Sequence, residues 1–241
     1  MIPASFTIPD RQALWRWQVQ RRLLPFVVHP DAGRPVTPVA DTVLPEWTIE
    51  PDWVCYCGGV GEDIRFELDL ARRWGVHVHL FDPTPRSIAF MEAVELPAEQ
   101  YTFLPVGLWS DDATLHFAAP QNEEYVSHTV MDGSAQPGFD APCRSIPSLM
   151  SELGHDRVDL LKMNIEGAEG AVLDAALAAG IRPQVITLTW EGDGAFRKAV
   201  ARTSRLRSEG YAFVGRNAWF FTYVNEEQPR PASAQADSRR R

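Results

Sequence analysis

The sequence has few cysteines, and this shortage excludes a disulfide-stabilised or zinc-bound protein. Only three cysteines occur in 241 residues. Cys55 and Cys57 flank Tyr56 in a predicted strand, where residues i and i+2 share one face and make poor disulfide partners. Cys143 stands alone, and a zinc site would need more ligands at suitable spacing. We therefore predict reduced thiols within the core.

Long apolar runs and excess positive charge are also missing. No run approaches the ~18 residues of a membrane span, and the N-terminus lacks the apolar core of a signal peptide. The 23 Lys and Arg against 32 Asp and Glu give a net charge of −9, which argues against a nucleic-acid partner. At 45% hydrophobic residues the chain can still bury a core. We expect a cytoplasmic globular protein with a small-molecule ligand.

Alternating strand and helix patterns predict an α/β domain over residues 51–225. The predicted strands are 53–57, 76–81, 101–108, 160–165 and 185–190, and the predicted helices are 62–74, 86–95, 145–153, 168–179 and 195–208. Strands at 211–214 and 218–224, turning through 215–217, predict a terminal antiparallel hairpin. Five βα units followed by a hairpin are more specific than a general nucleotide-binding pattern.

The remaining segments are predicted to cover the domain or to extend from it. A helical pattern from Arg11 to Leu24 predicts that residues 1–50 form an N-terminal arm with a helical cap, which packs on the domain or forms a lid. Residues 110–142 are rich in turn formers, with β-like runs at 114–117 and 125–131, and predict an insertion over the active site. The tail 226–241 is predicted to be disordered.

A glycine-rich turn, Gly58-Gly59-Val60-Gly61, follows the first predicted strand. It lets the backbone approach a ligand, and the N–H groups of the next helix point to the same place. The third glycine of the dinucleotide fingerprint is absent. Glu62 and Asp63, expected in the first helical turn, would repel phosphate but could face an ammonium or sulfonium group. The turn therefore favours a cofactor without phosphates.

Two further strand ends carry polar side chains. Asp82 ends the second strand, where a carboxylate can accept both hydroxyls of a ribose, although an Asp-Pro turn with Pro83 is the structural alternative. The fourth strand runs directly into Asn164, Glu166 and Glu169. Open α/β sheets bind ligands at the carboxyl ends of their strands. The sequence thus predicts a nucleotide-type cofactor site there.

Three segments together resemble the FkbM-type methyltransferases: residues 58–63 (GGVGED), residues 81–85 (FDPTP) and residues 159–169 (DLLKMNIEGAE). Those enzymes use S-adenosylmethionine on a Rossmann-like class I fold with a mostly parallel seven-stranded sheet, and known members mostly methylate oxygen on natural products or sugars. The resemblance covers residues 52–224. It implies an O-methyltransferase acting on a small-molecule hydroxyl. The residues assigned to the cofactor are Gly58, Gly59, Gly61, Glu62, Asp63, Asp82, Pro83, Leu108 and Asn164.

The chain departs from that pattern at two positions. Cys57 stands where many class I enzymes carry an acid, and Asn164 replaces the usual Asp and is too weakly basic to act as a general base. A hydroxyl acceptor must lose its proton, and the candidate bases are His128, Glu166, Glu169 and Glu191. Histidine suits neutral pH, although His128 could also be an ordinary surface residue. We interpret His77 and His79 as structural.

Alternative functions stay open at this stage. The ligand types of His128, Glu166 and Glu191 suit a divalent metal, but no close spacing demands one, so a metal is not favoured. A nicotinamide-dependent oxidoreductase is disfavoured by the missing glycine and by the acids at the phosphate end. Asn164 and Cys57 would also fit a catalytically silent cofactor-binding protein. The N-terminal arm could support a homodimer.

Overall fold

The computed structural model describes residues 30–31, 35–45, 48–118, 129–130, 137–190, 195–217 and 220–227. Several predicted features lie outside these ranges: the helix at 11–24, the part of the β-like run before residue 129, His128, Glu191 and the tail beyond residue 227. Within the described ranges, no helix is both long and apolar enough to cross a membrane.

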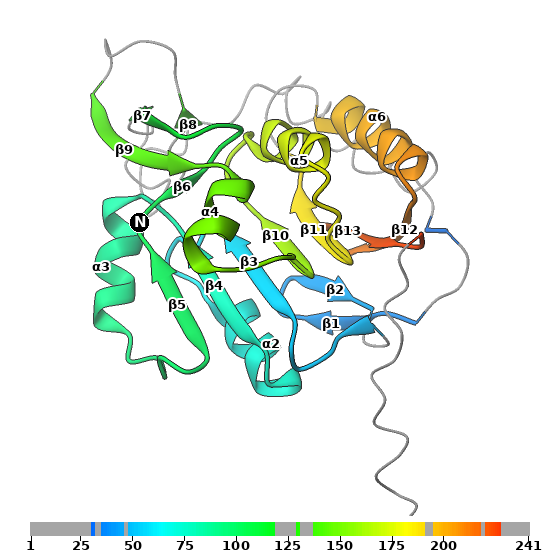
Figure 1. The fold of residues 1–241 in the computed structure, drawn as a ribbon, viewed down its shortest axis with the longest axis horizontal. Helices are drawn as coiled ribbons and strands as arrows, with labels where there is room; N and C mark the ends of the chain where they lie inside the picture. Colours follow the sequence, from blue (N-terminus) through cyan, green and yellow to red (C-terminus); the bar gives the residue numbers. More distant parts are fainter. Residues whose placement is uncertain are drawn as a thin grey trace, which may run out of the picture.

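A seven-stranded, mostly parallel sheet forms the centre of the molecule (Figure 1). Its strands in spatial order are β12 (Tyr211–Asn217), β13 (Phe220–Asn225), β11 (Val185–Thr189), β10 (Leu160–Met163), β3 (Val54–Gly58), β4 (His77–Phe81) and β5 (Tyr101–Leu104). The pairings from β11 to β5 are parallel, whereas β13 runs antiparallel to both β11 and β12. The predicted α/β class and terminal hairpin are confirmed. The predicted turn 215–217 is wrong, because these residues extend β12.

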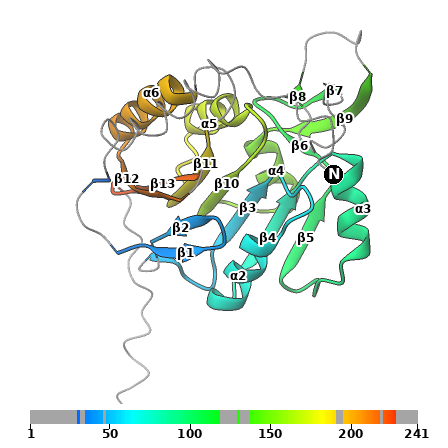
Figure 2. The same ribbon diagram turned by 180° about the vertical axis from the view of Figure 1, so that it is seen from behind.

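Both faces of this sheet are covered, which explains why its strands are nearly continuous apolar runs. The helices are α2 (Arg65–Trp74), α3 (Pro85–Ala93), α4 (Ile146–Leu153), α5 (Glu169–Ala178) and α6 (Ala195–Ser208). One buried cluster joins the sheet to α4, α5 and α6, and the other joins it to α2 and α3. Figures 1 and 2 show these two layers from opposite sides.

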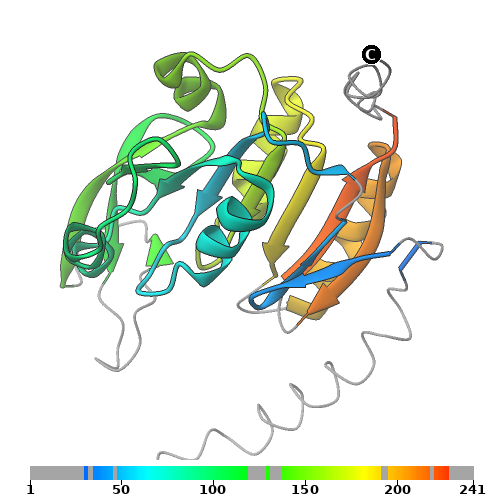
Figure 3. The ribbon, with the colours of Figure 1, turned by 90° about the horizontal axis from the view of Figure 1, so that it is seen from below.

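A short hairpin of β1 (Thr37–Val39) and β2 (Thr42–Leu44) packs on the same face as α2, against β12 and β13 (Figure 3). Buried hydroxyls fix its position. The Thr42 Oγ1 lies 2.8 Å from Thr187 Oγ1, and Thr222 Oγ1 donates to the backbone oxygen of Val43 at 2.7 Å. The sequence did not predict this hairpin, because three-residue strands give too little periodicity to recognise.

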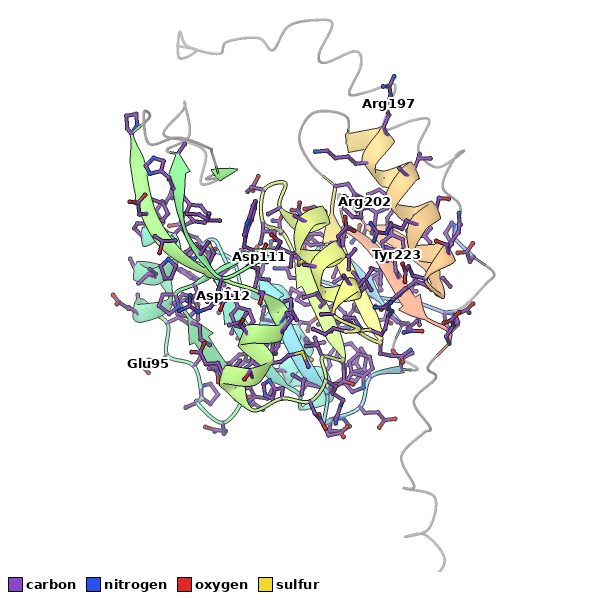
Figure 4. All side chains as sticks on the ribbon, turned by 45° about the horizontal axis from the view of Figure 1, so that its top comes forward. Glu95, Asp111, Asp112, Arg197, Arg202 and Tyr223 are labelled. Carbon is purple, nitrogen blue, oxygen red and sulfur yellow. The ribbon has the colours of Figure 1, made fainter. Side chains whose placement is uncertain are left out.

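Side-chain bonds connect α6 to its neighbours. Arg202 donates from Nη1 to both carboxylate oxygens of Asp174 on α5, at 2.6 and 2.5 Å. Tyr223 on β13 lies beneath α6, where its hydroxyl is 2.7 Å from Thr203 Oγ1 (Figure 4). Burial raises the pKa of Tyr223 to about 12, so this phenol stays neutral. These contacts hold the last helix over the end of the sheet.

A second, smaller sheet follows β5. Its order is β6 (Gly107–Leu108), β9 (Gly138–Arg144), β7 (Ala113–Ala118) and β8 (Thr129–Val130). The single strand predicted at 101–108 is therefore wrong: it divides at Pro105, which has no N–H to continue the ladder. The predicted run at 114–117 is found within β7, whereas β9 was not predicted. Asp112, beside Asp111 at the start of β7 (Figure 4), accepts from the backbone N–H of Ser145 at 2.9 Å and ties this sheet to α4.

The three cysteines, all within the described part of the chain, are free and buried, as predicted. Cys55 and Cys57 belong to the cluster on the α2 face, and Cys143 lies in the core of the smaller sheet. Burial raises the pKa of all three thiols. They therefore pack as neutral side chains.

A cluster of aromatic rings surrounds His79 on β4. His77 and His155 lie 4.6 Å from it between ring centroids, and Tyr56 lies 5.5 Å away. His79 is only 7% exposed, and its Nδ1 has no hydrogen-bond partner in the described structure. Burial, followed by the neighbouring His77 and His155, lowers the pKa of His79 from 6.5 to about 3. The structural interpretation of His77 and His79 is consistent with this packing.

This cluster predicts that the protein loses stability in mild acid. His79 stays neutral in the folded protein, whereas the same side chain in the unfolded chain takes up a proton near pH 6.5. Its contribution to the free energy of unfolding is therefore fully present above pH 6.5 and is lost as the pH falls toward 3. Between pH 6.5 and 5 the loss should reach about 2 kcal/mol. Urea unfolding at pH 7 and pH 5 measures it, and His79→Phe should reduce the difference by that amount. An unchanged difference in His79→Phe would assign the pH dependence to other groups.

Candidate functional site

The strands β3, β4 and β10 end side by side. Their register pairs Gly58 with Phe81 on one side and with Met163 on the other. The residues that follow these positions are therefore brought to one edge of the sheet: Gly59, Asp82 and Asn164. The sequence predicts each of these residues at the end of a strand. The parallel pairing of the strands brings the three residues together.

A cavity of about 290 Å³ opens at this edge. The predicted site residues that line it are Gly59, Gly61, Glu62, Asp63, Asp82, Pro83, Leu108, Asn164 and Glu166. Gly58 lies directly behind the wall, where an added Cβ would approach Leu108 Cδ1 to 2.4 Å. His128 and Glu191 lie outside the described residues. The cavity size is near the lower end of the range for small-molecule pockets.

The glycine turn depends on glycine at two positions. Gly59 has a φ of 81°, and a Cβ there would lie 1.9 Å from the backbone oxygen of Asn164. Gly61 has a φ of 57°, but a Cβ there would meet nothing within 4 Å. Gly59 is thus required for the contact between β3 and β10. Gly61 is required only for its left-handed backbone, which lines the cavity.

Asp82 holds this turn through four hydrogen bonds. Its Oδ2 accepts from the backbone N–H groups of Val60 and Gly61, at 2.9 and 3.0 Å. Its Oδ1 accepts from the backbone N–H and the hydroxyl of Thr84, at 2.9 and 2.7 Å. Thr84 is also the N-cap of α3. The carboxylate therefore connects the glycine turn to the start of α3, in addition to any contact with a ribose.

Glu62 and Asp63 precede α2, which begins at Arg65, so their predicted place in its first helical turn is wrong. The left-handed Gly61 delays the helix. Glu62 forms an ion pair with Arg86 on α3, and Asp63 pairs with Arg65 at 2.6 Å. The hydrogen bond from Arg65 lowers the pKa of Asp63 despite the opposing effect of burial. This carboxylate at the rim therefore stays charged.

Glu169 stabilises the loop after β10 through hydrogen bonds to the loop backbone. Its Oε1 accepts from the backbone N–H of Ile165 and its Oε2 from that of Gly167, both at 3.0 Å. Burial raises the pKa of Glu169, although these bonds oppose the shift. Thr189 Oγ1 lies within 3.2 Å of it and donates to Asn164 Oδ1 at 3.0 Å. Glu169 is buried and outside the cavity lining, so its candidacy as a base is not supported.

Glu166 reaches the cavity from a left-handed backbone, with a φ of 56°. Of the described non-glycine residues, only Glu166 and Ala40 have a positive φ, and both line the cavity. Such conformations persist where surrounding contacts hold them, and they concentrate at functional sites. For Glu166 the bonds that Glu169 makes on either side supply that restraint.

Sequence reasoning missed several residues of the cavity wall. Asp41 comes from the unpredicted β1–β2 hairpin, and Phe66 and Phe220 come from α2 and β13. Lys162 also lines the cavity, from the middle of β10. One signal was available for Lys162: it is a charged residue inside an otherwise apolar strand, and such a residue needs a partner when buried.

The charges of the cavity lining are mostly negative. The acidic lining residues are Asp41, Glu62, Asp63, Asp82 and Glu166, and Lys162 is the basic one within the described lining. Lys162 is paired with Glu67, at 3.0 Å, and Glu62 and Asp63 are likewise paired with Arg86 and Arg65. Such a lining suits a ligand with a cationic group and disfavours a pyrophosphate. Among the described residues no group of three His, Cys, Asp or Glu could hold a metal ion.

Comparison with known proteins finds a matching family model and related proteins. A family model described as "Methyltransferase FkbM domain" matches residues 56–213. The Homo sapiens protein named "Probable methyltransferase-like protein 24" is 29% identical over 137 residues, which are 56% of this chain and 31% of that protein. Its Rattus norvegicus counterpart is 28% identical over the same length and shares. The chain thus spans about a third of the length of these relatives.

Proposed function

We propose, since the chain belongs to the methyltransferase FkbM domain family, that this protein is an S-adenosylmethionine-dependent O-methyltransferase. Its acceptor would be a hydroxyl of a small molecule such as a natural product or a sugar. The observation that carries the proposal is the acidic cavity at the carboxyl ends of β3, β4 and β10, with a glycine turn in its wall. Such a site fits a sulfonium cofactor better than a dinucleotide.

The strand order supports a Rossmann-like class I methyltransferase fold. From β3 the chain proceeds outward through β4 to β5, and then returns to place β10 and β11 on the other side of β3. Ligands bind at such a reversal of strand order, outside the carboxyl ends of the strands. The glycine turn and Asn164 stand at that point, directly after β3 and β10, two neighbouring strands that Figure 1 labels. The antiparallel β13 beside β11, with β12 at the edge, completes the seven strands.

The residues of the cavity suggest how the cofactor would be held. S-adenosylmethionine, when bound, supplies an electrophilic methyl group on a positively charged sulfur. Gly59 and Gly61 allow close approach of the backbone, and the carboxylates of Glu62 and Asp63 favour its positive charge. Asp82 would offer its carboxylate to the ribose, with Pro83 and Leu108 forming apolar contacts beside it.

The proton of the acceptor hydroxyl needs a base, and Glu166 is the described candidate in the cavity. Its carboxylate would take that proton from the acceptor oxygen, and the cofactor would supply the methyl group, losing its sulfur–methyl bond and leaving as S-adenosylhomocysteine. Asn164 would orient the acceptor or the cofactor through its amide, since Thr189 fixes the side chain through Oδ1. His128 and Glu191 stay alternative bases in this proposal.

Cofactor preference tests the proposal. S-adenosylmethionine or S-adenosylhomocysteine at about a hundredfold above its Kd should stabilise the protein by about 2.7 kcal/mol, which is a rise in Tm of about 5–10 °C for a chain of this length. NAD and NADP should leave the Tm unchanged in the same thermal-shift titration. A shift with NAD alone would support the oxidoreductase instead. Cofactor binding without methylation of any hydroxyl in an acceptor panel would support a silent binding protein.

A further inference from the structure

Lys162 is the exceptional residue of β10, whose four residues are all buried. Its Nζ donates to the backbone oxygen of Gly59 at 3.2 Å and to Oε1 of Glu67 on α2 at 3.0 Å. The side chains of Lys162 and Glu67 are 7% and 1% exposed. An ion pair is therefore enclosed between the central strand, α2 and the glycine turn.

The pair is charged although it is buried. Burial has the largest effect on the pKa of Lys162 and lowers it, but Glu67, Cys57 and Asp41 together leave that pKa raised. The rings of Phe66 and Phe220 lie 5.8 and 5.9 Å from Nζ and add favourable contacts with the cation. Lys162 thus donates both of its hydrogen bonds as an ammonium group.

Stability alone does not explain this pair. Enclosing two charges costs desolvation that their attraction often fails to repay, and apolar residues of similar volume are frequently as stable. The carboxylate of Glu67 also has the thiol of Cys57 beside it. A buried ion pair of this kind points to a requirement at the place where it donates, which is the oxygen of Gly59.

Three N–H groups of the glycine turn are bonded on the opposite side, to β4 and the residue that follows it. The N–H of Gly59 donates to the backbone oxygen of Phe81 at 3.0 Å, and the N–H groups of Val60 and Gly61 donate to Asp82. The hydrogen bond from Lys162 to the oxygen of Gly59 comes from β10, on the opposite side of β3 from β4. The turn is therefore held from both sides, in the conformation that lines the cavity.

We propose that Lys162 and Glu67 are positioning residues for the cofactor: Glu67 fixes the ammonium of Lys162, and Lys162 fixes the glycine turn. This inference rests on the proposed function, because the cavity is taken as the cofactor site. Loss of Lys162 leaves the oxygen of Gly59 without this donor, so the turn becomes mobile and the cofactor must order it on binding. Affinity for the cofactor then falls even where the fold is retained.

Three variants test whether Lys162 and Glu67 position the glycine turn: Lys162→Met, Glu67→Gln and the double variant. The matched control is Lys198→Met, which removes the other lysine of the chain, an exposed one on α6. Calorimetry with S-adenosylhomocysteine gives the Kd, and thermal melting gives the Tm. Lys162→Met leaves Glu67 buried without its partner and should lower both affinity and Tm. Glu67→Gln keeps the donor to Gly59 but holds it less firmly, and should lower affinity by a smaller factor than Lys162→Met does.

The double variant separates positioning from stability. Because it removes both charges, its Tm should recover toward the wild-type value, whereas its affinity should stay about tenfold or more below wild type. The positioning role would be overturned if the double variant recovered both Tm and affinity, or if a folded Lys162→Met kept wild-type affinity. If the wild-type protein itself does not bind S-adenosylhomocysteine, the proposed function fails instead, and the two failures are distinguished by that first measurement.

Discussion

Replacement of Asp82 by alanine is expected to weaken binding of S-adenosylmethionine by at least about a hundredfold. The carboxylate accepts four hydrogen bonds that join the glycine turn to the start of α3. The two ribose hydroxyls would each lose a hydrogen bond to a charged group, worth about 1.5–3 kcal/mol, and the loss of both corresponds to this change in Kd. Calorimetry with S-adenosylhomocysteine measures it, and circular dichroism checks that the sheet persists.

The control for this variant is Asp111→Ala, which removes an exposed carboxylate outside the cavity lining. An analogue without ribose hydroxyls then separates the two roles of Asp82. If the carboxylate also binds the ribose, the wild-type protein should prefer the natural ligand and Asp82→Ala should lose that preference. If Asp82 only holds the turn, the variant should keep the preference at lower affinity. Wild-type affinity in a folded Asp82→Ala would remove the residue from the site altogether.

The chemical step should depend on a single base, and two substitutions identify it. Glu166→Gln or His128→Ala should lower kcat by about 10²–10⁴ when the replaced group is the base, without a matching loss of cofactor affinity. The reason is that the base acts on the acceptor hydroxyl and not on the cofactor. Methyl transfer to the acceptor, measured beside cofactor binding, separates the two effects.

The pH profile assigns the role. A histidine base predicts activity that rises through pH 6–7, and a glutamate base predicts a lower inflection unless burial raises it. Glu152→Gln, on the exposed side of α4, is the matched control for the amide substitution. Near-normal turnover of both Glu166→Gln and His128→Ala at several pH values would exclude both residues and leave Glu191 as the next candidate.

Elements with a strong local pattern could be predicted from the sequence with accurate bounds. The helix expected at 195–208 is α6, and the strand expected at 185–190 is β11 to within one residue. Helical and strand periodicities depend on neighbouring residues, so they need no tertiary information. The break at Pro105 and the late start of α2 at Arg65 were missed, although both have local causes, in a missing N–H and in a left-handed glycine.

Some features of the candidate site could also be predicted from the sequence, and others could not. A residue type at a strand end, such as Asp82 or Asn164, is visible in the sequence, and the structure places both beside one cavity. Their internal partners were not visible, because the contact of Lys162 with Glu67 joins residues 95 positions apart and its contact with Gly59 joins residues 103 apart. Nor could the sequence show that β1 and β2 place Asp41 in the same wall.

The sequence by itself therefore determined the succession of five βα units and a terminal hairpin, the glycine turn and the acidic character of the site, because these follow from local pattern and composition. Only the tertiary structure decided which of these groups meet. Parallel pairing of β3, β4 and β10 sets Gly59, Asp82 and Asn164 side by side. Burial then converts Lys162 from an exception in a strand into a charged donor to the glycine turn, since an enclosed ammonium must find acceptors within the fold.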